Sequence, residues 1–253
     1  MQLLARSLKQ VLGKLGIGIY NLRGKYAQDG LLTVHAASFR EDRRFRDAYA
    51  RGGRASYGFD PGFEWRVHTA LWAAQASLRV EGDFVECGVN AGFISSAIMK
   101  WLDWNRVGRR FYLVDTFSGP VMEQYSADEA KMSRLAIAAH GIDVGAYVTD
   151  MTRIRANFAE WSNTVIVQGT VPDVLHAINF ERVAFLHLDM NCALPERTAL
   201  EFFWDRLSPG AAVLLDEYAY SGHDCQREAI DRVVHRFHTS VLALPTGQGL
   251  LIR

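Results

Sequence analysis

The chain has 253 residues, of which 49% are apolar and 22% are charged, a composition typical of a globular domain with one core. Lys plus Arg equals Asp plus Glu, 28 of each, so the formal net charge is zero and there is no general attraction to nucleic acid. The three cysteines are far apart and form no CxxC pair, which argues against a zinc site or a disulfide framework and favours a reducing cytoplasm.

The first 60 residues are predicted to form a mostly helical extension that acts as a lid or an oligomer contact. Residues 1–25 carry five basic side chains and no acid, and their apolar residues share one helical face: Leu4, Leu8, Val11, Leu12 and Leu15. This face is expected to dock on the chain itself or on a second copy, with weak membrane-surface contact as the alternative. A charged helical segment, Ser38 to Tyr49, follows and is expected to end at Gly52 and Gly53.

Residues 61–253 form the predicted main domain, in which helical patterns alternate with short apolar runs. The helical patterns are 63–78, 93–101, 151–161, 171–178, 195–207 and 225–237, with a polar insertion over 121–150. Ser208-Pro209-Gly210 is expected to close the helix over 195–207. The apolar runs, predicted as strands, are 83–88, 110–115, 165–167, 183–189, 211–216, 241–244 and 249–252. This alternation predicts a parallel sheet that is covered by helices on both faces.

Only Pro245 to Gln248 separate the last two runs, so these runs are predicted to pair as a hairpin and to make one strand antiparallel. The predicted fold class is therefore α/β, a Rossmann-like doubly wound sheet of seven strands with one antiparallel. This arrangement resembles the class I methyltransferase fold, whose seventh strand inserts antiparallel beside the fifth.

The stretch Gly82-Asp83-Phe84-Val85-Glu86-Cys87-Gly88-Val89-Asn90-Ala91-Gly92 predicts a strand, a tight turn and the start of a helix, the unit that binds nucleotides. A dinucleotide fingerprint would need glycine where the chain has Asn90 and Phe93, because the second glycine lets the backbone approach a pyrophosphate. Their absence disfavours a nicotinamide oxidoreductase. It favours S-adenosyl-L-methionine, which has no pyrophosphate.

The strand ends supply the predicted cofactor contacts. Glu86 and Gly88 are expected beside the methionine tail, and the Asp115 carboxylate is suited to both ribose hydroxyls. Gln168 would lie near the adenine. As alternatives, Asp115 could cap the following segment, and Glu86 could pair with an arginine. The full predicted set is Glu86, Gly88, Asn90, Gly92, Asp115, Thr116, Ser118, Gln168 and Asp189.

Carboxylates also end the fourth and fifth strands. Asp189 ends the fourth, and Asp216 and Glu217 follow the fifth, so all three are expected in the same crevice as the cofactor. Three carboxylates without a histidine pair or thiolates suit a hard cation such as Mg²⁺. The alternative is that the adjacent acids are solvated charges or lie at a helix N-terminus.

Several motifs together resemble the macrocin O-methyltransferase family: residues 82–89, 114–119, 169–175, 187–189, 207–210 and 216–218. The resemblance covers residues 60–253. It implies a class I enzyme that uses S-adenosyl-L-methionine and Mg²⁺ to methylate sugar hydroxyls on macrolides or related natural products. It also implies Asp189, Asp216 and Glu217 as metal ligands, with Glu86 and Asp115 as cofactor residues.

One departure from the family pattern concerns the proton acceptor. The family commonly has a second acid two residues after the equivalent of Asp189, as a proposed general base, whereas this chain has Asn191. An amide cannot accept a proton at neutral pH, so His223, His187 and His140 become candidates, and the catalytic residues are predicted as Asp189, His223 and His187. A metal acting alone, or a non-catalytic binding or scaffold protein of the same fold, are the alternatives.

The expected partners follow from these assignments. The acceptor is predicted to be a small molecule with a hydroxyl group, most simply one that contains a sugar, and no nucleic acid is expected. No apolar run reaches the ~18 residues of a membrane-spanning helix. A cytoplasmic homo-oligomer is the predicted state, and no sequence feature identifies the acceptor itself.

Overall fold

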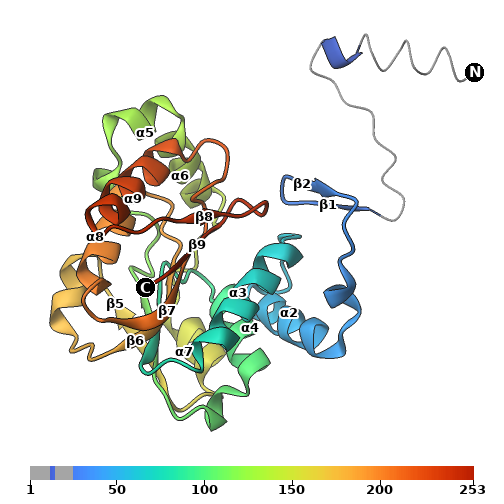
Figure 1. Ribbon diagram of the computed structural model, residues 1–253, viewed down its shortest axis with the longest axis vertical. Coiled ribbons are helices and arrows are strands. Elements are labelled where there is room, and N and C mark those ends of the chain that lie inside the picture. The colour runs from blue at the N-terminus through green and yellow to red at the C-terminus, as the bar shows by residue number, and fades with distance from the viewer. Residues whose placement is uncertain (1–11, 15–24) are drawn as a thin grey trace, which may run out of the picture. The chain divides into compact units, whose positions relative to one another are not determined.

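The computed structural model describes residues 12–14 and 25–253, which belong to two compact units, Met1–Ala37 and Ser38–Arg253 (Figure 1). In the first unit, residues 12–14 are helical, and strands β1 (Tyr26–Gln28) and β2 (Leu31–Thr33) form an antiparallel hairpin. The rest of the predicted apolar face, with Leu4, Leu8, Val11 and Leu15, lies outside the described residues.

The hairpin was not predicted, although its turn carries a recognisable signal. Asp29 and Gly30 both have positive φ angles, 50° and 71°. An Asp-Gly pair tolerates this conformation and is typical of two-residue hairpin turns.

The second unit is built on a seven-stranded sheet with the order β5-β4-β3-β6-β7-β9-β8 among the described residues. β9 is antiparallel to both of its neighbours, while β3 to β7 pair in parallel, which confirms the predicted fold class. The strands are β3 (Asp83–Cys87), β4 (Phe111–Asp115), β5 (Thr164–Gln168), β6 (Val183–Leu188), β7 (Leu207–Leu215), β8 (Leu242–Ala243) and β9 (Gly249–Ile252).

Helices cover both faces of this sheet, and the strand side chains alternate between them. Phe84 and Phe185 point into the core under α2, α3, α4 and α7, whereas Val85 and Leu186 point into the core under α8 and α9. The helical segments are η1 (Ser38–Glu41), α2 (Arg43–Ala55), α3 (Glu64–Ser77), α4 (Phe93–Leu102), η2 (Trp104–Arg106), η3 (Met122–Gln124), α5 (Ala127–Lys131), α6 (Arg134–Asp143), α7 (Met151–Phe158), η4 (Asp173–Ala177), α8 (Ala193–Phe203) and α9 (Asp224–Arg236).

Two glycine predictions were wrong for reasons of packing. Gly52 lies inside α2 instead of ending it, because α2 packs closely on α4 and a Cβ at Gly52 would come within 2.5 Å of the Phe93 ring. Ser208 to Gly210 belong to β7 instead of closing the preceding helix, and Gly210 there has φ 88° and donates to the Arg253 carbonyl at 2.7 Å. Residues 38–60 were predicted to be part of the N-terminal extension, but they contain α2, which belongs to the larger unit. The role of the extension as a lid or an oligomer contact stays a prediction.

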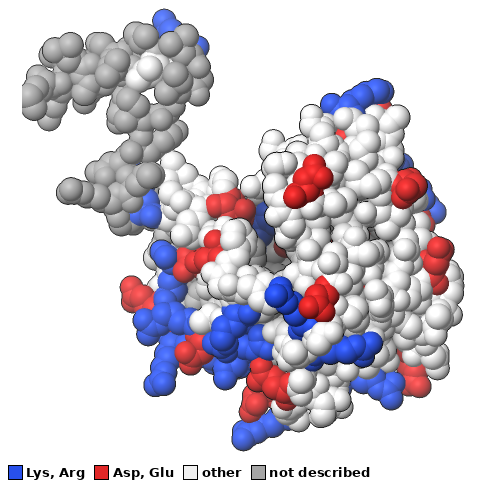
Figure 2. All heavy atoms as spheres, turned by 180° about the vertical axis from the view of Figure 1, so that it is seen from behind, with Lys and Arg blue, Asp and Glu red and all other residues white. Residues whose placement is uncertain are grey.

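The surface agrees with the balanced composition. On the face drawn in Figure 2, basic and acidic side chains lie among one another. None of the helices in the described part of the chain is both long and apolar enough to cross a membrane.

Truncation of Phe84 should test the core between β3, β4 and β6. Its ring is fully buried and lies 5.0 to 5.8 Å, centroid to centroid, from Trp104, Phe111 and Phe185. Phe84→Ala is expected to lower the free energy of unfolding in urea by about 3–5 kcal/mol, because it leaves a cavity. The control is Trp72→Ala, whose side chain is 58% exposed and which should cost under about 1 kcal/mol; equal losses would contradict this packing.

Candidate active site

A cavity of about 160 Å³ opens where β3, β4 and β6 end. Segments 119–121, 124–125 and 147–148 line it together with the strand ends. Five of the predicted cofactor residues also line it: Gly88, Asn90, Asp115, Thr116 and Asp189. The structure therefore brings these five together at the edge where doubly wound sheets bind ligands.

The Asp115 carboxylate holds the turn that follows β3. Its Oδ2 accepts hydrogen bonds from the backbone N–H groups of Val89 and Asn90 at 2.6 and 2.9 Å. Its Oδ1 accepts one from the Phe117 N–H at 2.7 Å. Asp115 thus caps the segment that follows it, as the sequence alternative stated, and also fixes the predicted cofactor loop.

Gly88 lies where the chain segments after β3 and β6 are in close contact. Its φ is +89°, and a Cβ built there would lie 1.9 Å from the Asp189 carbonyl oxygen. Only glycine fits this position without moving the backbone. The close contact brings the Asp189 side chain to the rim of the cofactor loop.

Asn90 joins this loop to the insertion. Its amide Nδ2 donates to the Ala146 carbonyl at 3.1 Å, and its Oδ1 accepts from the Val148 N–H at 2.9 Å. The Asn90 side chain therefore bonds to the backbone on both sides of Tyr147. Tyr147 itself lines the cavity.

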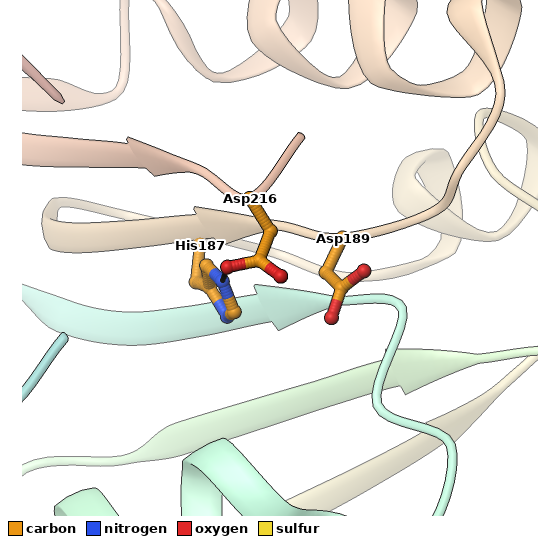
Figure 3. Close-up of side chains that lie close together, drawn as sticks. All are labelled: His187, Asp189 and Asp216. Carbon is orange, nitrogen blue, oxygen red and sulfur yellow. Dashed lines mark ion pairs between the residues drawn. The ribbon is translucent and has the colours of Figure 1, made fainter. Parts of the chain in front are cut away.

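Below the cavity, three ionisable side chains lie in a row on one face of the sheet. Glu86 and His187 are register partners on β3 and β6, and Asp216 follows β7. Figure 3 shows His187 and Asp216 together with Asp189, which follows β6. His187 Nδ1 lies 2.9 Å from Glu86 Oε1, and His187 Nε2 lies 3.7 Å from Asp216 Oδ1. Glu86 therefore has an ionic partner, but it is a histidine and not the arginine proposed as an alternative.

His187 is fully buried between these two acids. Burial opposes its charge, but the contacts with Asp216 and Glu86 outweigh it and raise the pKa of His187 well above 6.5. A protonated ring has no lone pair, so His187 would act as a base or a metal ligand only in its neutral form. The role of His187 as a proton acceptor stays a prediction.

Asp216 also receives an arginine and an amide. Arg66 of α3 approaches Asp216 Oδ2 at 2.6 Å and Glu217 Oε1 at 3.4 Å, and Gln248 Nε2 donates to Asp216 Oδ1 at 2.8 Å. Although burial opposes it, the Arg66 charge holds the pKa of Asp216 well below its usual range. Neither Arg66 nor Gln248 was singled out from the sequence.

Glu217 and Asp189 are only partly compensated, Glu217 by Arg66 and Asp189 by the side-chain amide of Asn191. Burial, and then the negative charge of nearby acids, raises the pKa of both carboxyl groups well above their usual range. Glu217 Oε2 is buried and has no hydrogen-bond partner in the described part of the chain. Atoms of His187, Asp189 and Asp216 come within 4.8 Å of one another. The hard carboxylate oxygens of Asp189 and Asp216 could hold a divalent cation, whereas Glu217 is not part of this group.

Asn191 bridges two charges instead of acting on a proton. Its Nδ2 donates to Asp189 Oδ1 at 3.1 Å, and its Oδ1 accepts from Arg134 Nη2 at 3.2 Å. The backbone N–H groups of Met190 and Asn191 both donate to Glu196, a buried acid on α8 that the sequence analysis did not select.

The remaining predicted residues lie around this centre. His223 is buried before α9, and Gly92, with φ 83°, precedes α4. Ser118 and Gln168 are exposed at the ends of their segments and are not among the residues lining the cavity, and His140 is exposed on α6. Gln168 Nε2 donates to the Thr116 carbonyl at 3.3 Å, so it lies beside the cavity rim.

The sequence profile of the macrocin-O-methyltransferase (TylF) family matches residues 67–241, more than two thirds of the chain. The chain belongs to this family. The matched region contains every strand end that lines the cavity, and it confirms the resemblance drawn from the sequence motifs.

Individual proteins that resemble this macrocin-O-methyltransferase family member share less than a third of its residues in the aligned regions. It is 29% identical over 160 residues to 8-demethyl-8-(2,3-dimethoxy-alpha-L-rhamnosyl)-tetracenomycin-C 4'-O-methyltransferase of Streptomyces olivaceus; the match covers 60% of this chain and 57% of that one. Among solved structures, the O-methyltransferase NovP superposes with a TM-score of 0.63 at 19% identity, over 74% of this chain and 79% of NovP. The calicheamicin methyltransferase CalS11 gives 0.54 at 17% identity, over 93% and 98%. These structures share the fold.

Gly88→Ala should test the close contact between β3 and β6. The added Cβ would collide with backbone, so the strand ends must separate, and we expect a loss of at least about 2 kcal/mol in the free energy of unfolding. Gly58→Ala is the matched control, because Gly58 has a similar φ of +83° but nothing within 4 Å of the built Cβ. Equal destabilisation would show that backbone strain alone, without the collision, accounts for the effect.

Proposed function

We propose that this protein is an S-adenosyl-L-methionine- and Mg²⁺-dependent O-methyltransferase that acts on a hydroxyl of a sugar or of a glycosylated small molecule. The observation that carries the proposal is the cavity at the carboxyl edge of the sheet. It brings the loop that Asp115 holds together with Asp189, which lies close to the buried Asp216, in a chain that belongs to the macrocin-O-methyltransferase family.

The donor is assigned to the β3 and β4 side of the cavity. Gly88, Asn90 and Gly92 shape the loop, and Asp115 and Thr116 stand where a ribose would be held. Glu86 Oε2 is buried without a hydrogen-bond partner among the described residues, and it provides an acceptor for the amino group of the methionine tail. Ser118 and Gln168 at the outer rim are assigned to the adenine end.

The metal is assigned to Asp189, Asp216 and Glu217. A bound Mg²⁺ would lower the pKa of a hydroxyl of the acceptor and orient it. Arg66 already compensates part of this charge, because it contacts both Asp216 and Glu217. In this structure Arg66 therefore contacts two of the carboxylates that the cation would bind.

The acceptor is assigned to the side of the cavity formed by the insertion. Val121, Tyr125 and Tyr147 give this wall apolar and aromatic surface, which suits the face of a sugar ring or an aglycone. The name of the Streptomyces relative gives a rhamnosyl-tetracenomycin-C as its acceptor, so rhamnosyl compounds are the first acceptors to assay. The loop that Asp115 holds and this wall line the same cavity, which would bring donor and hydroxyl together.

Cofactor binding is tested at Asp115. In Asp115→Asn, the amide nitrogen replaces an oxygen that accepts from the loop and would accept from the ribose. We expect S-adenosylhomocysteine to bind about 100-fold more weakly by calorimetry, as for the loss of two charge-assisted hydrogen bonds. Asp205→Asn, on an exposed acid, is the control. Unchanged affinity in Asp115→Asn would remove Asp115 from the site.

Metal binding is tested with Mn²⁺ as a spin-active substitute for Mg²⁺. We expect one Mn²⁺ to bind by electron paramagnetic resonance, to be lost in Asp216→Asn, and to bind roughly tenfold more tightly in Arg66→Met, because one competing positive charge is removed. Arg79→Met, beyond the end of α3, is the control. Weaker binding in Arg66→Met would mean that Arg66 supports the metal site instead of competing for it.

A further inference from the structure

Helices α8 and α9 lie side by side, and together they line a second, open groove (Figure 1). The groove has a volume of about 610 Å³. Arg197 and Glu201 line it from α8, and α9 contributes five residues, among them Asp231, Arg232 and Arg236. Among the described residues, none lines both this groove and the cavity at the strand ends. The groove is therefore separate from the candidate active site.

Both acids of the groove already have partners. Glu201 forms an ion pair with Arg236 of the other helix. Asp231 Oδ1 accepts a hydrogen bond from the Tyr218 hydroxyl at 2.5 Å. Arg236 also belongs to the last turn of α9, where the helix dipole stabilises a positive charge. Arg236 and the two acids are thus accounted for by contacts within the chain.

The other two arginines of the groove have no acid beside them. In the described part of the chain, neither Arg197 nor Arg232 forms an ion pair. Arg232 is exposed to water, whereas Arg197 is half-buried. The Nε atom of Arg197 is fully buried and has no hydrogen-bond partner among the described residues. A donor of a charged group that is taken out of water without a partner costs free energy.

Electrostatics within α8 does not explain Arg197. The residue lies in the second turn of α8, towards the N-terminal end, where a positive charge gains nothing from the helix dipole. Glu201 follows four residues later, a spacing that suits an ion pair with Arg197 on the helix surface. Glu201 is bound to Arg236 of α9 instead. An anionic ligand in the groove would supply the partner that Arg197 lacks.

We propose that the groove of α8 and α9 binds the phosphate group of a small molecule, with Arg197 and Arg232 as its ligands. The guanidinium group presents several N–H donors in a fork that matches the oxygens of a phosphate. A phosphate monoester carries nearly two negative charges at neutral pH, so it suits two unpaired cations better than a single carboxylate does. The inference does not depend on the proposed function, because the groove shares no lining residue with the active-site cavity.

Binding is tested by calorimetry of the whole protein with inorganic pyrophosphate, which stands in for a phosphorylated small molecule. EDTA is present, so that the anion cannot bind through a metal ion. We expect pyrophosphate to bind, and saturating S-adenosylhomocysteine not to displace it, because the two occupy separate sites. Malonate, which carries two carboxylates in place of the two phosphates, should bind about tenfold more weakly because it offers fewer oxygens and less charge.

Substitutions of opposite sign test the residues. Arg197→Met and Arg232→Met should each weaken the binding of pyrophosphate at least about tenfold, as for the loss of a charge-assisted hydrogen bond. Glu201→Gln should strengthen it roughly threefold, because it removes a negative charge and releases Arg236. Arg79→Met, on an exposed arginine outside the groove, is the control and should change nothing. Arg232 is exposed, so Arg232→Met keeps the test valid if Arg197→Met fails to fold.

Each contrary result overturns the proposal in a recognisable way. If pyrophosphate does not bind, or binds equally well to the folded Arg232→Met variant, the groove is not its site. If S-adenosylhomocysteine displaces pyrophosphate, the anion occupies the cavity at the strand ends instead. If malonate binds as tightly as pyrophosphate, the groove takes carboxylates and the assignment to phosphate is wrong. A protein that binds no S-adenosylhomocysteine would contradict the proposed function and leave the groove unaffected.

Discussion

Holding several carboxylates together at one buried edge of a sheet is the constraint on which the rest of this structure depends. Asp216 is stable there because α3 supplies Arg66, β6 supplies His187, and the connection before β9 supplies Gln248. A buried charge without partners costs several kcal/mol, so these elements must all arrive at the same place for the domain to fold. Glu217 and Asp189 are balanced only in part, by Arg66 and by the Asn191 amide.

The positions of the carboxylates could be predicted because parallel strands have one direction. An apolar run that ends in an acid places that acid at the carboxyl edge, and Asp115 and Asp189 meet there although 74 positions separate them in the sequence. Register could be predicted less well. Glu86 lies beside His187 because β3 pairs with β6 in one particular register. The alternation of apolar and polar residues along each strand does not determine that register.

The partners of these acids could not be predicted, because they come from other elements and depend on helix rotation and side-chain direction. Arg66 lies on a helix with apolar residues on most sides, and nothing in its spacing indicates that it reaches Asp216. Glu196 and Gln226 lie on different helices and meet only because α8 and α9 pack together. The end of α2 could not be predicted for a similar reason. A glycine pair is typical of a helix end, but Gly52 lies inside α2 and packs against Phe93.

The pairing of the Asn90 side chain with Ala146 and Val148 has a thermodynamic consequence. It ties the loop assigned to the donor to the wall assigned to the acceptor, so a ligand that moves one also changes the free energy of the other. Such coupling is reciprocal: if a bound donor alters the affinity for the acceptor by some factor, the acceptor must alter the affinity for the donor equally. We therefore expect heterotropic cooperativity between the two substrates, measurable as a difference in S-adenosylhomocysteine affinity with and without acceptor, and its absence in Asn90→Ala.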